Sequence, residues 1–495
     1  MLSGRGAVRQ QAAPATCFTC KGTDDETYGE ESVMKRIRAV SLFAFPLLLL
    51  VAADIALADD LFILATGRRD PRIYAIDFKA ALKHQNNNTP NAIVSRSKVH
   101  PDRLDGTRVG DPANIVLSED HRTAYVINHH GPVNNAEFLQ HGGRGSVSVM
   151  DVKKMLKPEF DDTDHAVEQN YDSGYFGAVG LVILPELLLV SHSENWLTED
   201  GSNRISIIDR KTGGRRGQIE MALGHPGHAC PAFPVPFVSP TPPPVVPFAT
   251  PDPQFGCWPN PEFLALGHGG DGKTYLFSGN AGTNDVSVMD LRQALMGVPV
   301  VEIAPRIPVQ TGPFGIKASP NGKFIAVTAR ESGQVDFEGN TISIIDVDRA
   351  RRGAANAEAA RVQVGTDDPK GQARPFTVAW TPDGREIIVA NFSTNNVSIV
   401  DLQRALAHDA RAEVARIPVI RPADADGLVR PGRPKGTAVT SDGRYAVVSG
   451  GPRLAPDAPP SGTVWVIDLH KRAVVATVTG VGNDPYGLTI LEDDD

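Results

Sequence analysis

The chain has 495 residues, of which 41% are hydrophobic and 22% charged, so it can bury a large core and is not disordered overall. Its formal net charge is −9, and no cluster of Lys and Arg interrupts the body of the chain, which argues against nucleic acid and anionic membrane surfaces as partners. The 47 glycines and 39 prolines indicate many turns, while four cysteines are too few for a disulfide scaffold.

The first element in chain order is a predicted signal peptide over residues 34–58. Basic residues directly after Met34 precede an apolar run, and Ala56-Leu57-Ala58 fits a signal-peptidase site. The run is shorter than a membrane-spanning helix, so cleavage is favoured over the alternative, an N-terminal membrane anchor. We therefore expect residues 1–33 to be a disordered gene-model extension and the exported chain to begin at Asp59, in the periplasm or outside the cell.

After the signal peptide, one short pattern of alternating apolar and small polar residues, ending in Asp, recurs seven times. The copies are Arg72–Asp77, Ser146–Asp151, Arg204–Asp209, Asp285–Asp290, Thr341–Asp346, Asn396–Asp401 and Thr463–Asp468. Alternation with β-branched residues predicts a half-buried strand in each copy. The Asp at each strand end is expected to cap a turn and to be structural.

A second pattern, a tight turn followed by a strand, lies upstream of most copies. It is clearest at Ser319–Lys323, Thr381–Arg385 and Thr440–Arg444, where Gly stands at the position that needs a positive φ. Each unit then has four antiparallel strands, A to D, and seven units predict an all-β, seven-bladed β-propeller over residues 59–495.

The two ends of the exported chain support a closed ring. Leu61–Thr66 resembles a B strand with no A strand before it, and Asp484–Leu491 resembles an A strand with no B strand after it. We expect these segments to pair and complete the first blade, so that no sheet edge is left open. A pair of β-sandwiches, the alternative, explains neither the seven copies nor the matching ends.

The segments Pro375–Asn391 and Asn395–Asp401 resemble the YVTN β-propeller repeat. That family is similar in fold to the heavy chain of methylamine dehydrogenase and to cytochrome d1-type propellers. The resemblance implies the fold and leaves the function open, because the repeat residues are structural. The chain has no CxxCH motif, so a covalent c-type haem is excluded.

Propeller topology predicts that the D–A and B–C loops emerge on one face, which we call the loop-bearing face. The tight A–B turns leave the opposite face plain, and binding residues concentrate on irregular loops over a rigid scaffold. The candidate ligand-binding residues on these loops are Asp111, Glu194, Arg330, Glu331, Lys435 and Asp484. Arg330 and Glu331 could bind an anion, act as acid and base, or form an exposed ion pair.

Five histidines fall on neighbouring loops of the same face: His129, His130, His192, His225 and His228. With Glu194 beside them, they could bind Zn²⁺ or Cu²⁺. The alternative is local hydrogen bonding, because no HxH or HExxH spacing is present.

A Pro-rich insertion at 225–261 is the longest D–A loop. Ten prolines lie between Cys230 and Cys257, so this segment cannot form a ladder strand and should cross the loop-bearing face as a lid or wall. Export favours a Cys230–Cys257 disulfide at its base over two free thiols. Cys17 and Cys20 precede the exported chain and receive no role.

These observations predict an exported, monomeric propeller that binds a small ligand or a periplasmic protein through its loop-bearing face, with no membrane contact after signal cleavage. The alternative is a periplasmic enzyme or enzyme subunit. It would be a metal-assisted lactonase-type hydrolase or a propeller subunit like the heavy chain of an amine dehydrogenase.

Overall fold

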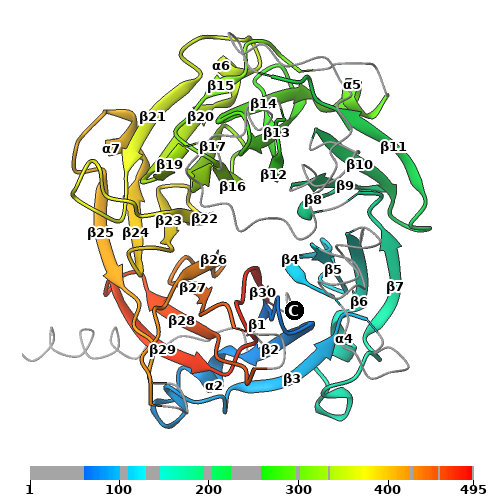
Figure 1. The fold of residues 1–495 in the computed structure, drawn as a ribbon, viewed down its shortest axis with the longest axis vertical. Coiled ribbons are helices and arrows are strands. Elements are labelled where there is room, and N and C mark those ends of the chain that lie inside the picture. The colour runs from blue at the N-terminus through cyan, green and yellow to red at the C-terminus, as the bar shows by residue number, and fades with distance from the viewer. Residues whose placement is uncertain are drawn as a thin grey trace, which may run out of the picture. The chain divides into compact units, whose positions relative to one another are not determined.

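A computed structural model of the chain describes ten segments: residues 61–100, 110–129, 145–175, 177–193, 203–224, 258–296, 302–332, 335–423, 427–454 and 458–492. They form a ring of seven four-stranded antiparallel sheets, viewed down its axis in Figure 1. The predicted all-β, seven-bladed propeller is therefore confirmed.

The strands of blades 1 to 4 run outward from the axis as follows. Blade 1 has β30 (Leu488–Glu492), β1 (Leu61–Thr66), β2 (Arg72–Asp77) and β3 (Ile93–Lys98); blade 2 has β4 (Pro112–Leu117), β5 (Thr123–Asn128), β6 (Ser146–Asp151) and β7 (Val167–Asp172). Blade 3 has β8 (Ala178–Ile183), β9 (Leu187–His192), β10 (Arg204–Asp209) and β11 (Arg215–Glu220); blade 4 has β12 (Pro261–His268), β13 (Thr274–Asn280), β14 (Asp285–Asp290) and β15 (Ile307–Pro308).

Blades 5 to 7 follow the same order. Blade 5 has β16 (Pro313–Ala318), β17 (Phe324–Ala329), β20 (Thr341–Asp346) and β21 (Glu358–Gln363); blade 6 has β22 (Pro375–Trp380), β23 (Glu386–Asn391), β24 (Asn396–Asp401) and β25 (Glu413–Pro418); blade 7 has β26 (Pro434–Val439), β27 (Tyr445–Gly450), β28 (Thr463–Asp468) and β29 (Ala473–Thr479). The seven predicted copies are the third strands of the seven blades, with the predicted bounds.

The Asp that ends each third strand is structural, as predicted. In five blades its carboxylate accepts a hydrogen bond from a backbone N–H and caps a short helix: α2 (Phe78–Ala81), α4 (Val152–Met155), α5 (Leu291–Leu295), α6 (Val347–Ala350) and α7 (Leu402–Leu406). Asp209 and Asp468 accept from Thr212 and Lys471 in the same way at turns. Two single 3₁₀ turns, η1 (His84–Asn86) and η2 (Pro158–Phe160), complete the outer connections.

The A–B turns have the predicted chemistry. Gly322 has a φ of 67°, and the Ser319 hydroxyl bonds to Asn321 while the Phe324 N–H donates to that hydroxyl. In blade 2 His121 stands at the glycine position and still adopts a φ of 54°.

The ring closes through the first blade, as the chain ends predicted. β1 pairs with β30 in antiparallel register, from Leu61 opposite Glu492 to Ala65 opposite Leu488. The buried core lies between neighbouring blades: Leu491 of the closing strand packs in one cluster with Leu64 of blade 1 and Val126 of blade 2. Closure therefore combines a hydrogen-bond ladder with apolar packing.

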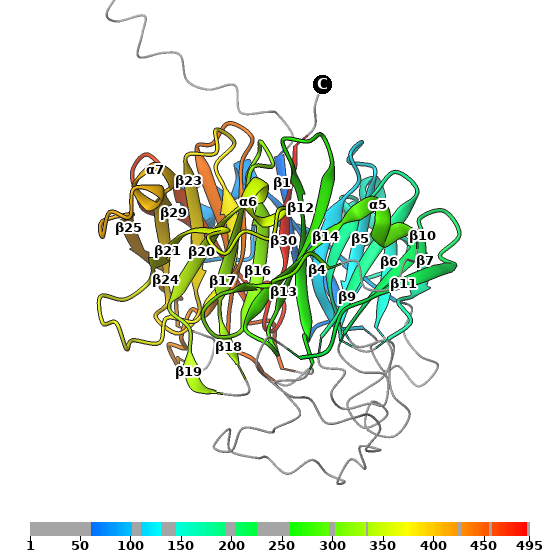
Figure 2. The ribbon, with the colours of Figure 1, turned by 90° about the horizontal axis from the view of Figure 1, so that it is seen from above.

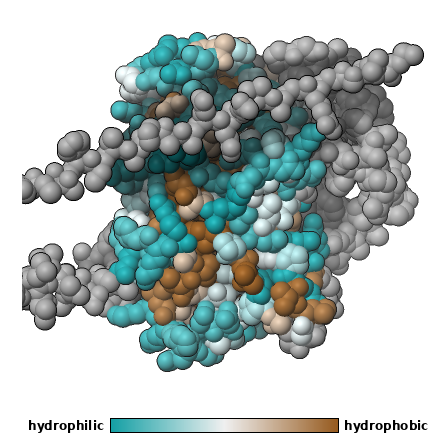
Figure 3. Space-filling model, turned by 90° about the vertical axis from the view of Figure 1, so that its left-hand side faces the viewer, coloured by the Kyte–Doolittle hydropathy of each residue, from teal (hydrophilic) through white to brown (hydrophobic). Residues whose placement is uncertain are grey.

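The two faces of the ring differ as the topology predicts. Seen from the side, the C–D helices lie toward one face, and a hairpin of β18 (Glu331–Ser332) and β19 (Val335–Glu338) projects from the other (Figure 2). The outer side that carries β25 is mostly hydrophilic, with a hydrophobic area near its middle (Figure 3). Among the described residues, no helix is long and apolar enough to cross a membrane.

Candidate functional site: the mouth of the central channel

The innermost strands share a start that the repeat analysis did not use. Five of the seven begin at a proline, and in blade 1 Pro485 lies shortly before β30. The residue before this proline, or before Ala178 in blade 3, takes a left-handed φ in six blades, for example 53° at Arg374 and 66° at Asp484. A β-bulge follows the first residue in most blades, as between Pro313 and Ile316. The positions after the proline, or its equivalent, are all buried: Ala113, Val179, Glu262, Phe314, Phe376, Lys435 and Tyr486.

Three of these side chains form an aromatic cluster on the ring axis. The ring centroids of Phe314 and Phe376 lie 4.7 Å apart, those of Phe376 and Tyr486 4.7 Å, and those of Phe314 and Tyr486 6.0 Å. The three residues come from the innermost strands of blades 5 and 6 and from the segment that enters the closing strand of blade 1. Contact between blades 5 and 1, which are not neighbours, is possible only at the centre of the ring.

Cationic side chains cover these rings on the loop-bearing side. The Arg330 guanidinium carbon lies 3.9 Å from the centroid of Phe314, and its Nη1 donates a hydrogen bond of 3.1 Å to the Tyr486 hydroxyl. The Arg68 guanidinium carbon lies 4.1 Å from the centroid of the Tyr486 ring. Stacking on an aromatic face leaves the in-plane N–H donors of a guanidinium at its rim, where they can reach a carboxylate or phosphate.

Phe392, which follows the second strand of blade 6, carries a second group of cations. The Arg374, Arg433 and Lys435 charges lie 4.7, 5.3 and 5.2 Å from its ring centroid. Phe392, Arg374 and Arg433 are only partly buried, so solvent reaches them. Phe392 also stacks on Phe376 at 5.9 Å, which joins this group to the axial aromatic cluster.

Two carboxylates are paired within this region. Asp484 Oδ1 lies 2.6 Å from Lys435 Nζ, with both side chains almost fully buried, and Asp111 Oδ1 lies 3.2 Å from Arg68 Nε. Burial lowers the pKa of Lys435 from its ordinary value, and the Asp484 carboxylate opposes that shift. Burial raises the pKa of Tyr486, so its hydroxyl stays protonated at neutral pH.

We call this assembly the mouth cluster. Its aromatic residues are Phe314, Phe376, Phe392 and Tyr486; its cations are Arg68, Arg69, Arg330, Arg374, Arg433, Lys435 and Arg453; and its carboxylates are Asp111, Glu262 and Asp484. Among the described side chains, seven cations therefore face three carboxylates, in a chain whose net charge is −9. Burial and the neighbouring Arg453 lower the pKa of Arg69, which is the electrostatic effect expected where like charges gather.

The structure brings four of the predicted ligand-binding residues to this one region: Asp111, Arg330, Lys435 and Asp484. Arg330 is half-buried, with its guanidinium against Phe314, and its predicted ion pair with Glu331 lies outside the described side chains. The side chains of Glu194 and Glu331 lie outside the described part of the chain.

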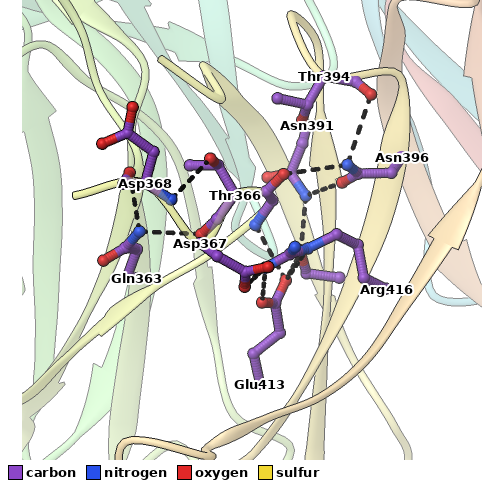
Figure 4. Close-up of polar contacts among 11 residues, drawn as sticks. Gln363, Thr366, Asp367, Asp368, Asn391, Thr394, Asn396, Glu413 and Arg416 are labelled. Atoms are coloured by element: carbon purple, nitrogen blue, oxygen red, sulfur yellow. Dashed lines mark hydrogen bonds and ion pairs between the residues drawn. The ribbon is translucent and has the colours of Figure 1, made fainter. Parts of the chain in front are cut away.

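A buried polar network inside the blades explains several loop-end residues. In blade 6, Asn391 donates to Asn396 and to Ser398, and Ser398 donates to the Glu413 carboxylate, which Arg416 pairs (Figure 4). Asn128 in blade 2 and Asn280 in blade 4 likewise donate to a serine of the next strand, Ser148 and Ser287. These hydrogen bonds link neighbouring strands and hold the strands of a blade in register.

His192 occupies the position of those asparagines in blade 3. Its side chain is buried, bonds through Nε2 to Ser206 Oγ at 3.0 Å, and packs edge-on against Tyr175. His129 is also buried, with Nδ1 3.1 Å from the Ala178 carbonyl oxygen. Both rings therefore have structural contacts within or between blades.

The rest of the predicted metal site lies outside the described residues, namely His130, His225, His228 and Glu194. Within the described segments, no three His, Cys, Asp or Glu side chains are grouped so that they could share a metal ion. Zn²⁺ or Cu²⁺ binding stays a prediction, which metal analysis of the purified chain tests. The Cys230–Cys257 disulfide and the insertion also fall outside the described residues, and thiol titration of the denatured, unreduced chain tests that pairing.

Sequence reasoning missed the aromatic and most of the cationic members of the mouth cluster. The signal was present in the dipeptides that open or lead into the innermost strands, such as Pro313-Phe314, Pro375-Phe376 and Pro485-Tyr486. Reading these dipeptides as one ring would have placed large aromatic residues on the axis, with the arginines Arg374 and Arg433 one position before their prolines.

No protein-family model matches the chain, and no curated protein matches it. Solved propellers resemble it in structure. The periplasmic gluconolactonase PpgL of Pseudomonas aeruginosa is 14% identical, with a TM-score of 0.53 over 87% of this chain and 99% of that one. A putative 6-phosphogluconolactonase of Bacteroides fragilis is 12% identical, with a TM-score of 0.50 over 88% and 100%. The hydrazine synthase of Kuenenia stuttgartiensis is 16% identical, with a TM-score of 0.48 over 80% and 89%. The likenesses to PpgL and to the Bacteroides fragilis protein show the fold.

Proposed function

We propose that the chain is an exported propeller of the YVTN-repeat type that binds a small organic anion with two or more negative charges at the mouth cluster. The observation that carries the proposal is the set of arginines stacked on aromatic rings around the axis, with Arg330 at its centre. Charge-assisted hydrogen bonds from guanidinium groups to carboxylate or phosphate are among the strong ones in proteins. A cluster with more cations than carboxylates favours a ligand that supplies several negative charges.

The aromatic rings contribute to this site by fixing the arginines. A guanidinium held against Phe314 or Tyr486 loses less freedom when it meets a ligand than one on a flexible exposed stem, so less ordering entropy opposes binding. The buried Lys435–Asp484 pair fixes the position of a further cation of the mouth cluster. A di- or tricarboxylate or a sugar-acid phosphate carries the several negative charges that these cations favour.

Calorimetric titration of the exported chain with 6-phosphogluconate at low ionic strength tests the proposal, with glucose as the uncharged comparison. We expect one site for the anion, none for glucose, and weaker binding as salt is added. The Arg330→Gln variant should bind about 10- to 100-fold more weakly, because one charge-assisted hydrogen bond contributes about 1.5–3 kcal/mol.

Arg385→Gln is the matched control, since Arg385 is an exposed arginine on an A–B turn far from the mouth cluster in the topology. It should bind the anion as the wild type does. Equal affinities of wild type and Arg330→Gln would refute the proposal.

Hydrolysis of a sugar lactone is the second candidate function. Glu262 is buried beside Tyr486 in the same ring of residues, and a carboxylate next to an anion site can activate a water molecule. Solved propellers named gluconolactonases share the fold. Acid release from 6-phosphogluconolactone, lost in Glu262→Gln while 6-phosphogluconate still binds, would assign this activity; binding without turnover would leave the binding role.

A further inference from the structure

A cavity lies in the central channel, on the side of the aromatic cluster away from the loop-bearing face. It has a volume of about 420 Å³ and is lined by the innermost strands, from Tyr486 at one end to Pro320 of an A–B turn at the other. It therefore reaches toward the plain face, opposite the loop-bearing face. A volume of this size is within the usual range for small-molecule pockets.

Lys317 gives this cavity its charge. It lies on β16, and among the described residues that line the cavity it is the only cation. Its side chain is exposed to the channel, and desolvation by the channel walls lowers the pKa of the ammonium from its ordinary value. In the described part of the chain, no carboxylate pairs with the Lys317 ammonium.

The rest of the wall is apolar or carries hydroxyl groups. Ile316 and Val378 contribute apolar surface, and Thr377 and Thr437 lie with their hydroxyl oxygens 3.1 Å apart. A single ammonium in the channel matches a single negative charge, whereas a dianion would bring a second charge into the channel without a partner.

We infer that the channel is a second ligand site, entered from the plain face, which binds a small organic monocarboxylate with its carboxylate on Lys317 and its apolar part against the innermost strands. The incoming carboxylate supplies the counter-ion that the described residues do not provide. This site does not rest on the mouth cluster and takes a ligand of different charge.

Calorimetry of the full exported chain with benzoate, hexanoate and acetate tests the inference, with benzamide as the neutral isostere of benzoate. We expect one site for benzoate or hexanoate, and none for benzamide. Lys317→Met should lose at least tenfold in affinity, while its thermal unfolding stays that of a folded propeller. Lys323→Met, which removes an exposed lysine from the turn of the same hairpin, should bind as the wild type does.

The position of the ligand separates this site from the mouth cluster. Crystals soaked with 4-bromobenzoate should show bromine density in the channel beside Lys317, and Arg330→Gln should keep benzoate binding. Bromine density only at the mouth cluster, Lys317→Met that binds like the wild type, or no binding of any of the three carboxylates would overturn the inference.

Discussion

Lys435 Nζ and Asp484 Oδ1 lie 2.6 Å apart in an almost fully buried ion pair that joins the first strand of blade 7 to the segment leading into the closing strand of blade 1. Both residues were predicted from the sequence as ligand-binding residues, and the structure shows that they connect blade 7 to blade 1. The pair stands at the edge of the mouth cluster, with Lys435 5.2 Å from the Phe392 ring centroid. Site geometry and ring closure are therefore linked at this point.

Breaking this pair should destabilise the ring. Lys435→Met leaves the Asp484 carboxylate buried without its closest partner, so we expect the free energy of unfolding to fall by about 3–5 kcal/mol in urea denaturation. The double variant Lys435→Met/Asp484→Asn should recover part of that loss, because no charge is left uncompensated. Arg385→Ala breaks the exposed Arg385–Asp383 pair and should cost less than about 1 kcal/mol. A loss of that small size in Lys435→Met would contradict the role given to the buried pair.

The free energy of unfolding should decrease as the pH is lowered, because of His100. This side chain is buried, and its Nε2 lies at hydrogen-bond distance, 3.1 Å, from Ser146 Oγ. Burial lowers the pKa of His100 to about 4, whereas an unfolded histidine titrates near 6.5. Between these values the unfolded chain binds the proton and the folded chain does not. Stability is therefore full above pH 6.5 and decreases as the pH falls to about 4, by on the order of 3 kcal/mol.

Urea denaturation at a series of pH values measures this decrease. His100→Gln keeps a polar group near Ser146 but cannot take up the proton, so its stability should change less over the same pH range. If the two pH profiles run parallel, His100 is not the titrating group.

The closing strand should depend on its apolar face. Leu491 is buried in the cluster that includes Leu64 and Val126, so Leu491→Ala should cost about 2–4 kcal/mol of unfolding free energy. Thr489→Ala, in the same strand but partly exposed, should cost less than about 1 kcal/mol. Thermal or urea denaturation compares the two; equal small effects would mean that the ladder with β1 alone closes the ring.

The repeat pattern predicted the fold because each copy forms its strand and its turn through interactions between residues close together in the sequence. Alternating β-branched residues ending in Asp occur once per blade, and the Asp side chain caps a backbone N–H three residues later, so one short segment determines both the strand and its end. The same holds for the A–B turns, where Gly322 and Gly384 adopt a positive φ. Closure followed because the two end fragments are complementary.

The site could be predicted only in part, because it depends on contacts between blades far apart in the sequence. Loop topology was enough to bring Asp111, Arg330, Lys435 and Asp484 to one face. It could not show that Tyr486 meets Phe314 on the axis, since this contact joins residues more than 170 positions apart. It also could not show that His192 lies inside its blade, where it replaces the asparagine of other blades.

A crystal structure of the chain from residue 59 onward with 6-phosphogluconate bound tests the central claim, that the mouth cluster is an anion site, most directly. We predict that the phosphate or the carboxylate lies within hydrogen-bond distance of the Arg330 guanidinium, with the other anionic group on a second arginine of the mouth cluster. A ligand bound elsewhere on the ring, or a mouth cluster without the ligand at saturating concentration, would contradict the claim.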